Sequence, residues 1–258
     1  MAREVDLAVV GAGAAGLLAA AAAKRLGFDV LVLESSGLVG GDTAVGSGRM
    51  WLPGTHLATS LGITDTPEAA TDYLNAILGA ETDASTAARR QAFAQAAPKL
   101  ARWLAASNLP LLVERGVPDY HPASAGGRPE GRVLATTPTD RKSLGEWAGK
   151  LRSRKPADEA GGLTTLLRQF THSEGYAATG GEALVAELLR RATANGADIW
   201  LDTTVEDIVQ DGPSGSVTGL LVRKDGDQIE IRTRKGVLLA VGGFAGSQEL
   251  REEYLPLP

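Results

Sequence analysis

Residues 7–16 read Leu-Ala-Val-Val-Gly-Ala-Gly-Ala-Ala-Gly, and they predict a strand followed by a glycine turn. The four consecutive apolar residues 7–10 are typical of a parallel strand that is buried on both faces. An alanine-rich stretch with helical character follows Gly16, and residues 30–33 predict a second strand. The G-x-G-x-x-G spacing is weak evidence alone, but a strand before it and a helix after it indicate a dinucleotide-binding βαβ unit.

Each glycine of this turn has an expected role. Gly11 allows a tight turn, Gly13 lets a pyrophosphate approach bare backbone, and Gly16 lets the helix lie close to the strand. The free amides at the helix N-terminus are donors for the phosphates. Glu34 follows the second strand, where a carboxylate can accept hydrogen bonds from ribose hydroxyls and disfavours a 2′-phosphate. The alternative is a βαβ unit without a ligand.

The uncharged run of residues 7–23 also has some features of a signal peptide or a membrane span. Its 17 residues are fewer than the ~20 that cross a bilayer, and it carries the three spaced glycines. Asp6, rather than a basic cluster, precedes it. We therefore expect a cytoplasmic protein without a transmembrane segment, and we leave peripheral association with a membrane open.

The composition is that of an ordinary globular protein. The chain has 258 residues, of which 43% are hydrophobic and 22% charged, enough for a sizeable core in one or two domains. A net charge of −5 without a long basic run argues against a nucleic-acid partner. The lack of cysteine excludes disulfides, thiolate metal sites and cysteine nucleophiles, and His56, His121 and His172 are too scattered to suggest a metal site.

Two irregular segments are candidates for ligand contact. Residues 35–51 are glycine or small at most positions, which suits a backbone that passes close to a diphosphate and a flat ring system. A flexible surface loop is the alternative. In residues 117–132, Pro118 and Pro122 flank Asp119-Tyr120-His121, and this favours an ordered loop at a ligand site over a disordered one.

The remaining pattern is mainly helical up to residue 155 and mainly strand-like after residue 197. Thr66 and Pro67 predict the start of one helix, and residues 86–106 predict another, in which Pro98 should start or kink the second part. Gly180-Gly181 opens a further helix, which residues 195–196 close. Strands are expected at residues 198–201, 203–209, 217–224 and 228–233, the last two as a hairpin, and a separate apolar strand is expected from residue 236.

Six motifs follow one another along the chain: GAGAAG at 11–16, VLVLES at 30–35, GGDTA at 40–44, PDYHP at 118–122, GGEAL at 180–184 and VLLAVGGF at 237–244. Their order resembles that in the flavoproteins related to 3-ketosteroid Δ1-dehydrogenase and soluble fumarate reductase. GGDTA together with MWLP at 50–53 and PDYHP looks more like the steroid dehydrogenase branch. The resemblance implies an α/β fold: a two-dinucleotide-binding (Rossmann-like) FAD domain with a parallel central sheet, a small antiparallel β-meander and a helical insertion at about residues 57–165.

The resemblance also implies FAD as the cofactor and assigns its contacts. The pyrophosphate is expected at the turn, at Gly11, Gly13, Ala14, Ala15 and Gly16. The adenine ribose is expected at Glu34 and Ser35, and the adenine at the backbone of Val205. The ribityl chain and isoalloxazine are expected near Gly40, Gly41, Asp42, Thr43, Ala44, Gly46, Ser47 and Gly48, while Ala240, Gly242 and Gly243 close over the dinucleotide. Gly46-Ser47-Gly48 departs from the Ser-Gly-Gly that is frequent in the family, and Arg49 stands where a smaller or apolar residue is usual.

Family members are about twice as long as this chain. The resemblance therefore implies that residues 1–258 form an FAD-binding domain that lacks its C-terminal return segment and the substrate-capping domain, which carries the main catalytic residues. Tyr120 is expected to support the catalytic base. The implied activity is 1,2-desaturation of an apolar 3-ketosteroid, with electrons passing to an external acceptor. The alternatives are a fumarate reductase-like enoate reductase, a non-catalytic FAD-binding fragment, and a less favoured NAD-binding dehydrogenase domain.

Overall fold

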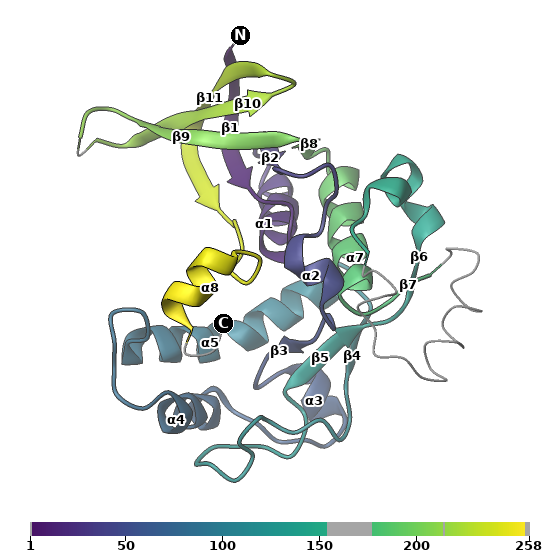
Figure 1. Ribbon diagram of the computed structural model, residues 1–258. Helices are drawn as coiled ribbons and strands as arrows, with labels where there is room; N and C mark the ends of the chain where they lie inside the picture. Colours follow the sequence, from purple (N-terminus) through teal and green to yellow (C-terminus); the bar gives the residue numbers. More distant parts are fainter. Residues whose placement is uncertain (1, 154–176, 214, 256–258) are drawn as a thin grey trace. The chain divides into compact units, whose positions relative to one another are not determined.

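The computed structural model describes residues 2–153, 177–213 and 215–255, and the chain forms two compact units (Figure 1). The first unit comprises Met1–Gly46, Asp140–Ala177 and Val185–Pro258, and the second comprises Ser47–Thr139 and Ala178–Leu184. His172 and the last part of the predicted insertion, residues 154–165, lie outside the described residues. None of the described helices is long and apolar enough to cross a membrane.

A six-stranded sheet forms the centre of the first unit. Its order is β8-β2-β1-β11-β10-β9, and β1 is parallel to both of its neighbours, while β10 is antiparallel to β9 and β11. The strands are β1 (Ala2–Val10), β2 (Val30–Leu33), β8 (Asp198–Trp200), β9 (Thr203–Gln210), β10 (Val217–Lys224) and β11 (Asp227–Leu239). This confirms the α/β fold with a parallel central sheet and an antiparallel ribbon.

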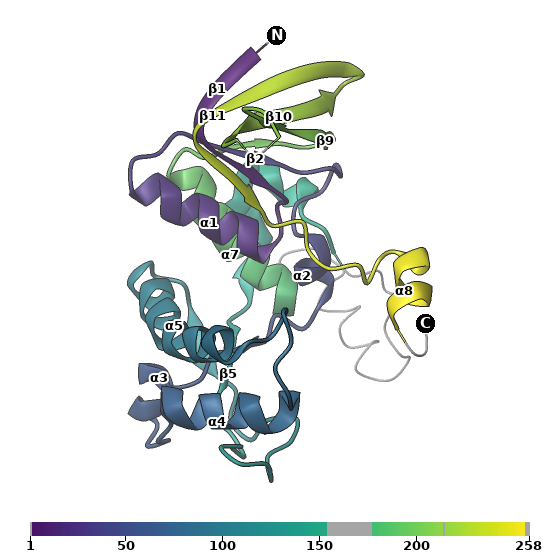
Figure 2. The same cartoon turned by 90° about the vertical axis from the view of Figure 1, so that its left-hand side faces the viewer.

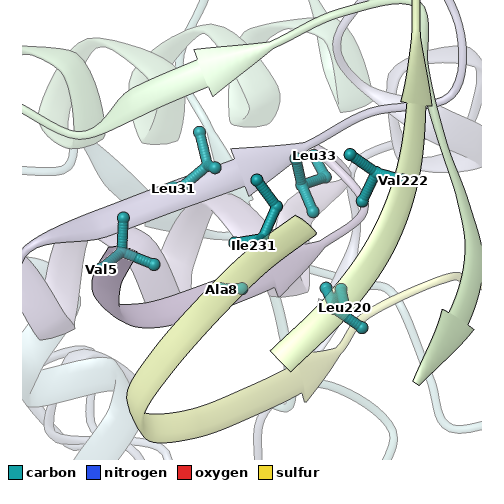
Figure 3. Close-up of a cluster of buried hydrophobic side chains, with 7 residues drawn as sticks. All are labelled: Val5, Ala8, Leu31, Leu33, Leu220, Val222 and Ile231. Carbon is teal, nitrogen blue, oxygen red and sulfur yellow. The ribbon is translucent and has the colours of Figure 1, made fainter. Parts of the chain in front are cut away.

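Apolar side chains from the parallel strands and from the antiparallel ribbon of this sheet make one core. Figure 3 shows Val5, Ala8, Leu31, Leu33, Leu220, Val222 and Ile231, which are at most 1% exposed. Helix α1 (Ala14–Arg25) packs against β1 and β2, as Figure 2 shows, and buries Gly16, Leu17 and Ala20. The uncharged run at residues 7–23 is therefore the end of a strand, the turn and most of a helix.

The return strand is not separate from the hairpin, contrary to the expectation from the sequence. The predicted strands at 228–233 and from residue 236 are the single strand β11, which pairs with β10 and also with β1. Its pairing with β1 shifts between Val5 and Leu7, beside Gly236 at φ +136°. This irregularity in the pairing lets β11 continue through Gly236, where the sequence predicted a break between two strands. The two-residue turn at Asp225-Gly226, with φ of 52° and 87°, is confirmed.

The second unit contains helices and a small sheet. Its helices are α3 (His56–Ser60), α4 (Pro67–Leu78) and α5 (Ala87–Ala106), and the antiparallel strands β3 (Met50–Trp51), β5 (Val133–Thr136) and β4 (Leu111–Val113) are paired in that order. Leu52, Ala97 and Leu134 belong to its core. The mainly helical prediction for residues 57–155 was therefore incomplete, because short paired strands give little periodic signal.

Helix starts were predicted better than the effect of proline. The Thr66 and Thr86 hydroxyls accept hydrogen bonds from Ala69 N and Arg89 N, as N-caps do. Helix α5, however, continues through Pro98, so Pro98 does not start a separate helix; the alternative, that it kinks α5, stays a prediction. Pro98 is buried on the same face as Ala94 and Ala101, and this packing offsets the missing backbone hydrogen bond.

The remaining described elements connect and follow these parts. They are α2 (Gly41–Val45), β6 (Thr139–Asp140), the 3-10 segment η1 (Arg141–Lys150), β7 (Ala177–Ala178), α7 (Gly180–Ala194) and α8 (Gln248–Tyr254). Helix α7 begins and ends as the glycines at 180–181 and 196 predicted.

Candidate dinucleotide site

The ends of three strands meet at the glycine turn. Gly11 N donates to the Leu33 carbonyl at 2.7 Å, and Ala240 N donates to the Val10 carbonyl at 2.8 Å, so β1, β2 and β11 end together. A Cβ at Gly11 would collide with the Ala240 carbonyl oxygen, and one at Gly16 would collide with the Gly11 carbonyl oxygen. Both glycines are therefore required by close contacts within the protein backbone.

Gly13 differs from the other two glycines. A Cβ added there would come no closer to its surroundings than 3.9 Å, at the Gly40 carbonyl oxygen. Among the described residues no contact requires glycine at this position, whereas a ligand that approached bare backbone would. Gly13 is the N-cap of α1 and its residue type offers no capping side chain, so the helix N-terminus remains suited to a phosphate. This space and these amides fit the pyrophosphate of a dinucleotide.

Glu34 is buried and hydrogen-bonded to the same turn. Its Oε2 accepts from Ala12 N at 2.9 Å, and its Oε1 accepts from Ser36 N and Ser36 Oγ, both at 3.0 Å. Ser35 Oγ lies 3.5 Å from Oε1, at the limit of a hydrogen bond. A carboxylate offers about four acceptor positions, so Oε2 keeps capacity for a ribose hydroxyl. The sequence predicts a contact of Glu34 with the ribose, but it gives no sign that Glu34 also fixes the turn through Ala12 and Ser36.

The glycines at positions 40–41 lead into a short helix that is tied to the turn. Gly40 N donates to the Ala12 carbonyl at 2.9 Å, and Ala14 N approaches Thr43 Oγ1 at 3.4 Å. Gly40 has φ +125°, a value that favours glycine, and leads directly into α2. Asp42 and Ala44 lie in α2 and Gly46 ends it. The contacts of Asp42, Ala44 and Gly46 with the flavin stay predictions, as do those of Ser47 and Gly48, which belong to the second unit. The contact of Ala15 with the pyrophosphate also stays a prediction.

Strand β9 begins beside Glu34. Thr203 N donates to the Glu34 carbonyl at 2.9 Å, and Asp202 N donates to the Ser36 carbonyl at 3.1 Å. Val205 lies two residues further along β9 and packs against the core of the sheet. Its predicted contact with the adenine stays a prediction, as do the contacts of Ala240, Gly242 and Gly243 with the dinucleotide. A Cβ at Gly242 or Gly243 would have no neighbour within 4 Å in the part of the chain that the structure describes.

Tyr120 lies in the second unit, and its side chain is 98% exposed. The residues around it are firmly held: Asp119 is buried and paired with Arg132, which also pairs with Asp65. Burial raises the pKa of Asp65, but hydrogen bonds from Arg132 and Gly54, with the charges of Arg132 and Arg128, outweigh it and hold that pKa below its ordinary value. The supporting role of Tyr120 in catalysis stays a prediction.

Metal ligation was not expected from the sequence. In the described parts of the chain, no three histidine, cysteine or acidic residues are placed so that they could hold a metal ion. The site is therefore characterised by its glycine turn, its buried acid and the N-terminus of α1.

Comparison with known families identifies the class of protein. Residues 6–258 match the family described as the FAD binding domain. The chain therefore belongs to this family of FAD-binding flavoproteins, and FAD is its cofactor.

Relatives point to one branch of these flavoproteins. The 3-oxosteroid 1-dehydrogenase of Comamonas testosteroni is 31% identical over 288 aligned positions, gaps included, and the alignment covers 99% of this chain and 49% of the relative. The structure of 3-ketosteroid Δ1-dehydrogenase from Sterolibacterium denitrificans has a TM-score of 0.83 and 28% identity, and the match covers 99% of this chain and 51% of that one. NADH:fumarate oxidoreductase of Klebsiella pneumoniae is 28% identical over 98% of this chain and 22% of its own length. The chain spans about half the length of the steroid dehydrogenases, and the resemblance to this branch is confirmed.

Proposed function

We propose that this chain is the FAD-binding part of a 3-ketosteroid Δ1-dehydrogenase-like oxidoreductase. The observation that carries the proposal is similarity to a 3-oxosteroid 1-dehydrogenase over 99% of the chain, from the glycine turn to the end of the sheet. The substrate would be an apolar 3-ketosteroid, in which a double bond forms between C1 and C2. An external acceptor would take up the electrons.

The described residues would bind the cofactor and orient it. The amides at the N-terminus of α1 and the open space at Gly13 would hold the pyrophosphate, while Glu34 would accept from the adenine ribose. FAD, when bound, supplies the acceptor for the hydride that leaves C1. Tyr120 would support the base that removes the C2 proton, which the neighbouring ketone makes acidic.

The domain organisation is part of the same proposal. Residues 1–258 would form the FAD-binding domain, with an insertion at about residues 57–165. The steroid-covering domain, the proton-removing residue and the segment that completes the flavin site would lie in the half of the relatives that this chain does not match. We also infer a cytoplasmic location, supported by the placement of the uncharged run 7–23 inside the βαβ unit.

The activity can be tested by steady-state assay of a protein that carries this chain and has the full length of the relatives. We expect reduction of a dye acceptor with a 3-ketosteroid as the electron donor. The matched control is the same protein with fumarate and a reduced dye. Turnover of fumarate without any turnover of ketosteroid would overturn the proposal.

A fumarate reductase-like enoate reductase is the second candidate. It is supported by the Klebsiella pneumoniae relative, although that match covers a smaller share of the relative. A non-catalytic FAD-binding protein is the third candidate: absorbance near 450 nm, with no turnover of either substrate by the protein of the relatives' length, would support it.

A further inference from the structure

The second unit contains a buried ion cluster that the dinucleotide site does not use. Arg132 is 1% exposed and donates through Nε and Nη2 to Asp65, at 2.9 and 2.7 Å, and through Nη1 to Asp119 at 2.8 Å. The side chains of the two acids are 2% and 1% exposed. Arg128, which is half-buried, adds a second cation at 3.4 Å from Asp65. The rigid fork of a guanidinium fixes the directions of both carboxylates.

Asp119 anchors the backbone on one side of Tyr120. Its Oδ1 accepts from the Trp51 indole N–H at 2.7 Å, and its Oδ2 accepts from Arg128 N at 2.9 Å as well as from Arg132. Its own backbone N–H donates to the Arg128 carbonyl at 3.0 Å. The carboxylate thus joins both ends of the loop from residue 119 to residue 128.

The residue on the other side of Tyr120 is anchored by the same cluster. His121 N donates to the Tyr73 hydroxyl at 3.2 Å. The Arg132 guanidinium carbon lies 5.5 Å from the centroid of the Tyr73 ring and 5.4 Å from that of Trp51, within range of cation–π attraction. Both neighbours of Tyr120 are therefore tied to Arg132, either directly or through one aromatic side chain.

Tyr120 itself contributes little to the packing of the second unit, because its side chain is 98% exposed. Buried ion pairs are a weak source of stability compared with apolar packing, but they specify one geometry. We propose that Asp119 and Arg132 are positioning residues that hold the loop so that the Tyr120 phenol is presented at a fixed place. This inference rests on the proposed function, in which Tyr120 supports the catalytic base.

The first test uses Asp119→Asn in the 258-residue chain. An amide nitrogen would face either the Trp51 indole N–H or the N–H groups of Arg128 and Arg132, so one set of donors loses its acceptor. Asp65 still pairs with Arg132 through two hydrogen bonds, which preserves the rest of the unit. We expect amide hydrogen exchange to become about tenfold faster or more across residues 119–128 and to remain unchanged in β5.

A matched control lies at the outer end of the same segment. Glu130 is bonded to Arg115 and to Gly116 N at the surface, so Glu130→Gln makes the same chemical change without touching the cluster. Relaxation of the 19F signal of 3-fluorotyrosine at position 120, assigned with Tyr120→Phe, reports on the tyrosine directly. Equal exchange and relaxation in Asp119→Asn and Glu130→Gln would overturn the inference.

The second test separates positioning from stability in a catalytically active protein of the relatives' length. We expect Asp119→Asn to lower kcat for the ketosteroid, with KM changed by about twofold or less, because FAD and steroid binding do not need this carboxylate. Asp119→Asn combined with Tyr120→Phe should be no slower than Tyr120→Phe alone, since Asp119 acts through Tyr120. Additive losses would contradict the inference. If the parent protein turns over no ketosteroid, the proposed function fails, and the exchange measurement still decides whether the cluster holds the loop.

Discussion

Buried carboxylates hold both the glycine turn and the loop around Tyr120 in place, but the hydrogen-bond partners of these carboxylates differ. In the described part of the chain, Glu34 accepts hydrogen bonds from neutral groups of Ala12, Ser35 and Ser36. Asp65 and Asp119 instead face the cation of Arg132. A carboxylate that is bonded to neutral donors can still accept from a ligand, whereas a carboxylate in an ion cluster is committed to the protein. The arrangement around Glu34 suits a ligand-binding site, and the ion cluster around Arg132 suits a structure that holds a loop in place.

The largest loss of stability is expected when the Arg132 cation is removed from the ion cluster. Arg132→Met leaves Asp65 and Asp119 buried without their main partner, which costs about 3–5 kcal/mol. Urea unfolding of the chain measures this loss. Arg115→Met removes an arginine of an exposed pair and should change the midpoint little. Similar midpoints for the two variants would show that the cluster contributes no more than a surface pair.

Two single substitutions separate the role of the glycine turn in stability from its expected role in FAD binding. Gly16→Ala forces a Cβ into the Gly11 carbonyl oxygen, so we expect a loss of about 1–3 kcal/mol in the free energy of unfolding. Gly13→Ala has room and should cost less than about 1 kcal/mol, yet it should weaken FAD binding by about tenfold or more. Thermal unfolding and quenching of flavin fluorescence measure the two effects. Unchanged FAD affinity in Gly13→Ala would mean that the pyrophosphate does not approach this position.

Glu34→Gln tests whether the buried acid serves both the turn and the cofactor. The amide nitrogen would face a donor at either Ala12 or Ser36, which costs about 1–3 kcal/mol. Affinity for FAD should fall further than affinity for FMN, because FMN lacks the adenosine that Glu34 is expected to contact. Equal losses for both flavins would assign Glu34 to the turn alone. Glu130→Gln is the control, since it makes the same chemical change at a surface acid that is bonded to Arg115 and has no predicted cofactor contact.

The smallest effect is a pH dependence from Asp65. Its pKa in the folded chain lies below the ordinary value of 3.8, so its contribution to stability is present above that pH and is lost as the pH falls towards the folded pKa. Urea unfolding between about pH 5 and pH 3 should therefore lose stability more steeply in the parent chain than in Asp65→Asn. Parallel slopes would show that Asp65 is not stabilised as an anion.

The sequence predicted the dinucleotide turn well because its parts are close along the chain. Gly11, Gly13 and Gly16 have fixed spacing, and Glu34 comes directly after the second strand. The ion cluster that holds the Tyr120 loop could not be predicted, because Asp65 and Arg132 are 67 residues apart and no motif links them. Asp119 and Trp51 were visible only as members of motifs, 68 residues apart. Contacts of this kind depend on how helices and strands pack, which residue spacing does not encode.

The continuity of β11 has a consequence for folding kinetics. Its first half pairs with β10 across a two-residue turn, whereas its parallel partner β1 lies near the other end of the chain. The local ribbon can form quickly, but the pairing of β1 with β11 closes a very long loop and is slow. During synthesis the first strand therefore waits, with one edge open, until residue 239 has emerged, and mutations that slow this late closure should favour aggregation more than their effect on equilibrium stability suggests.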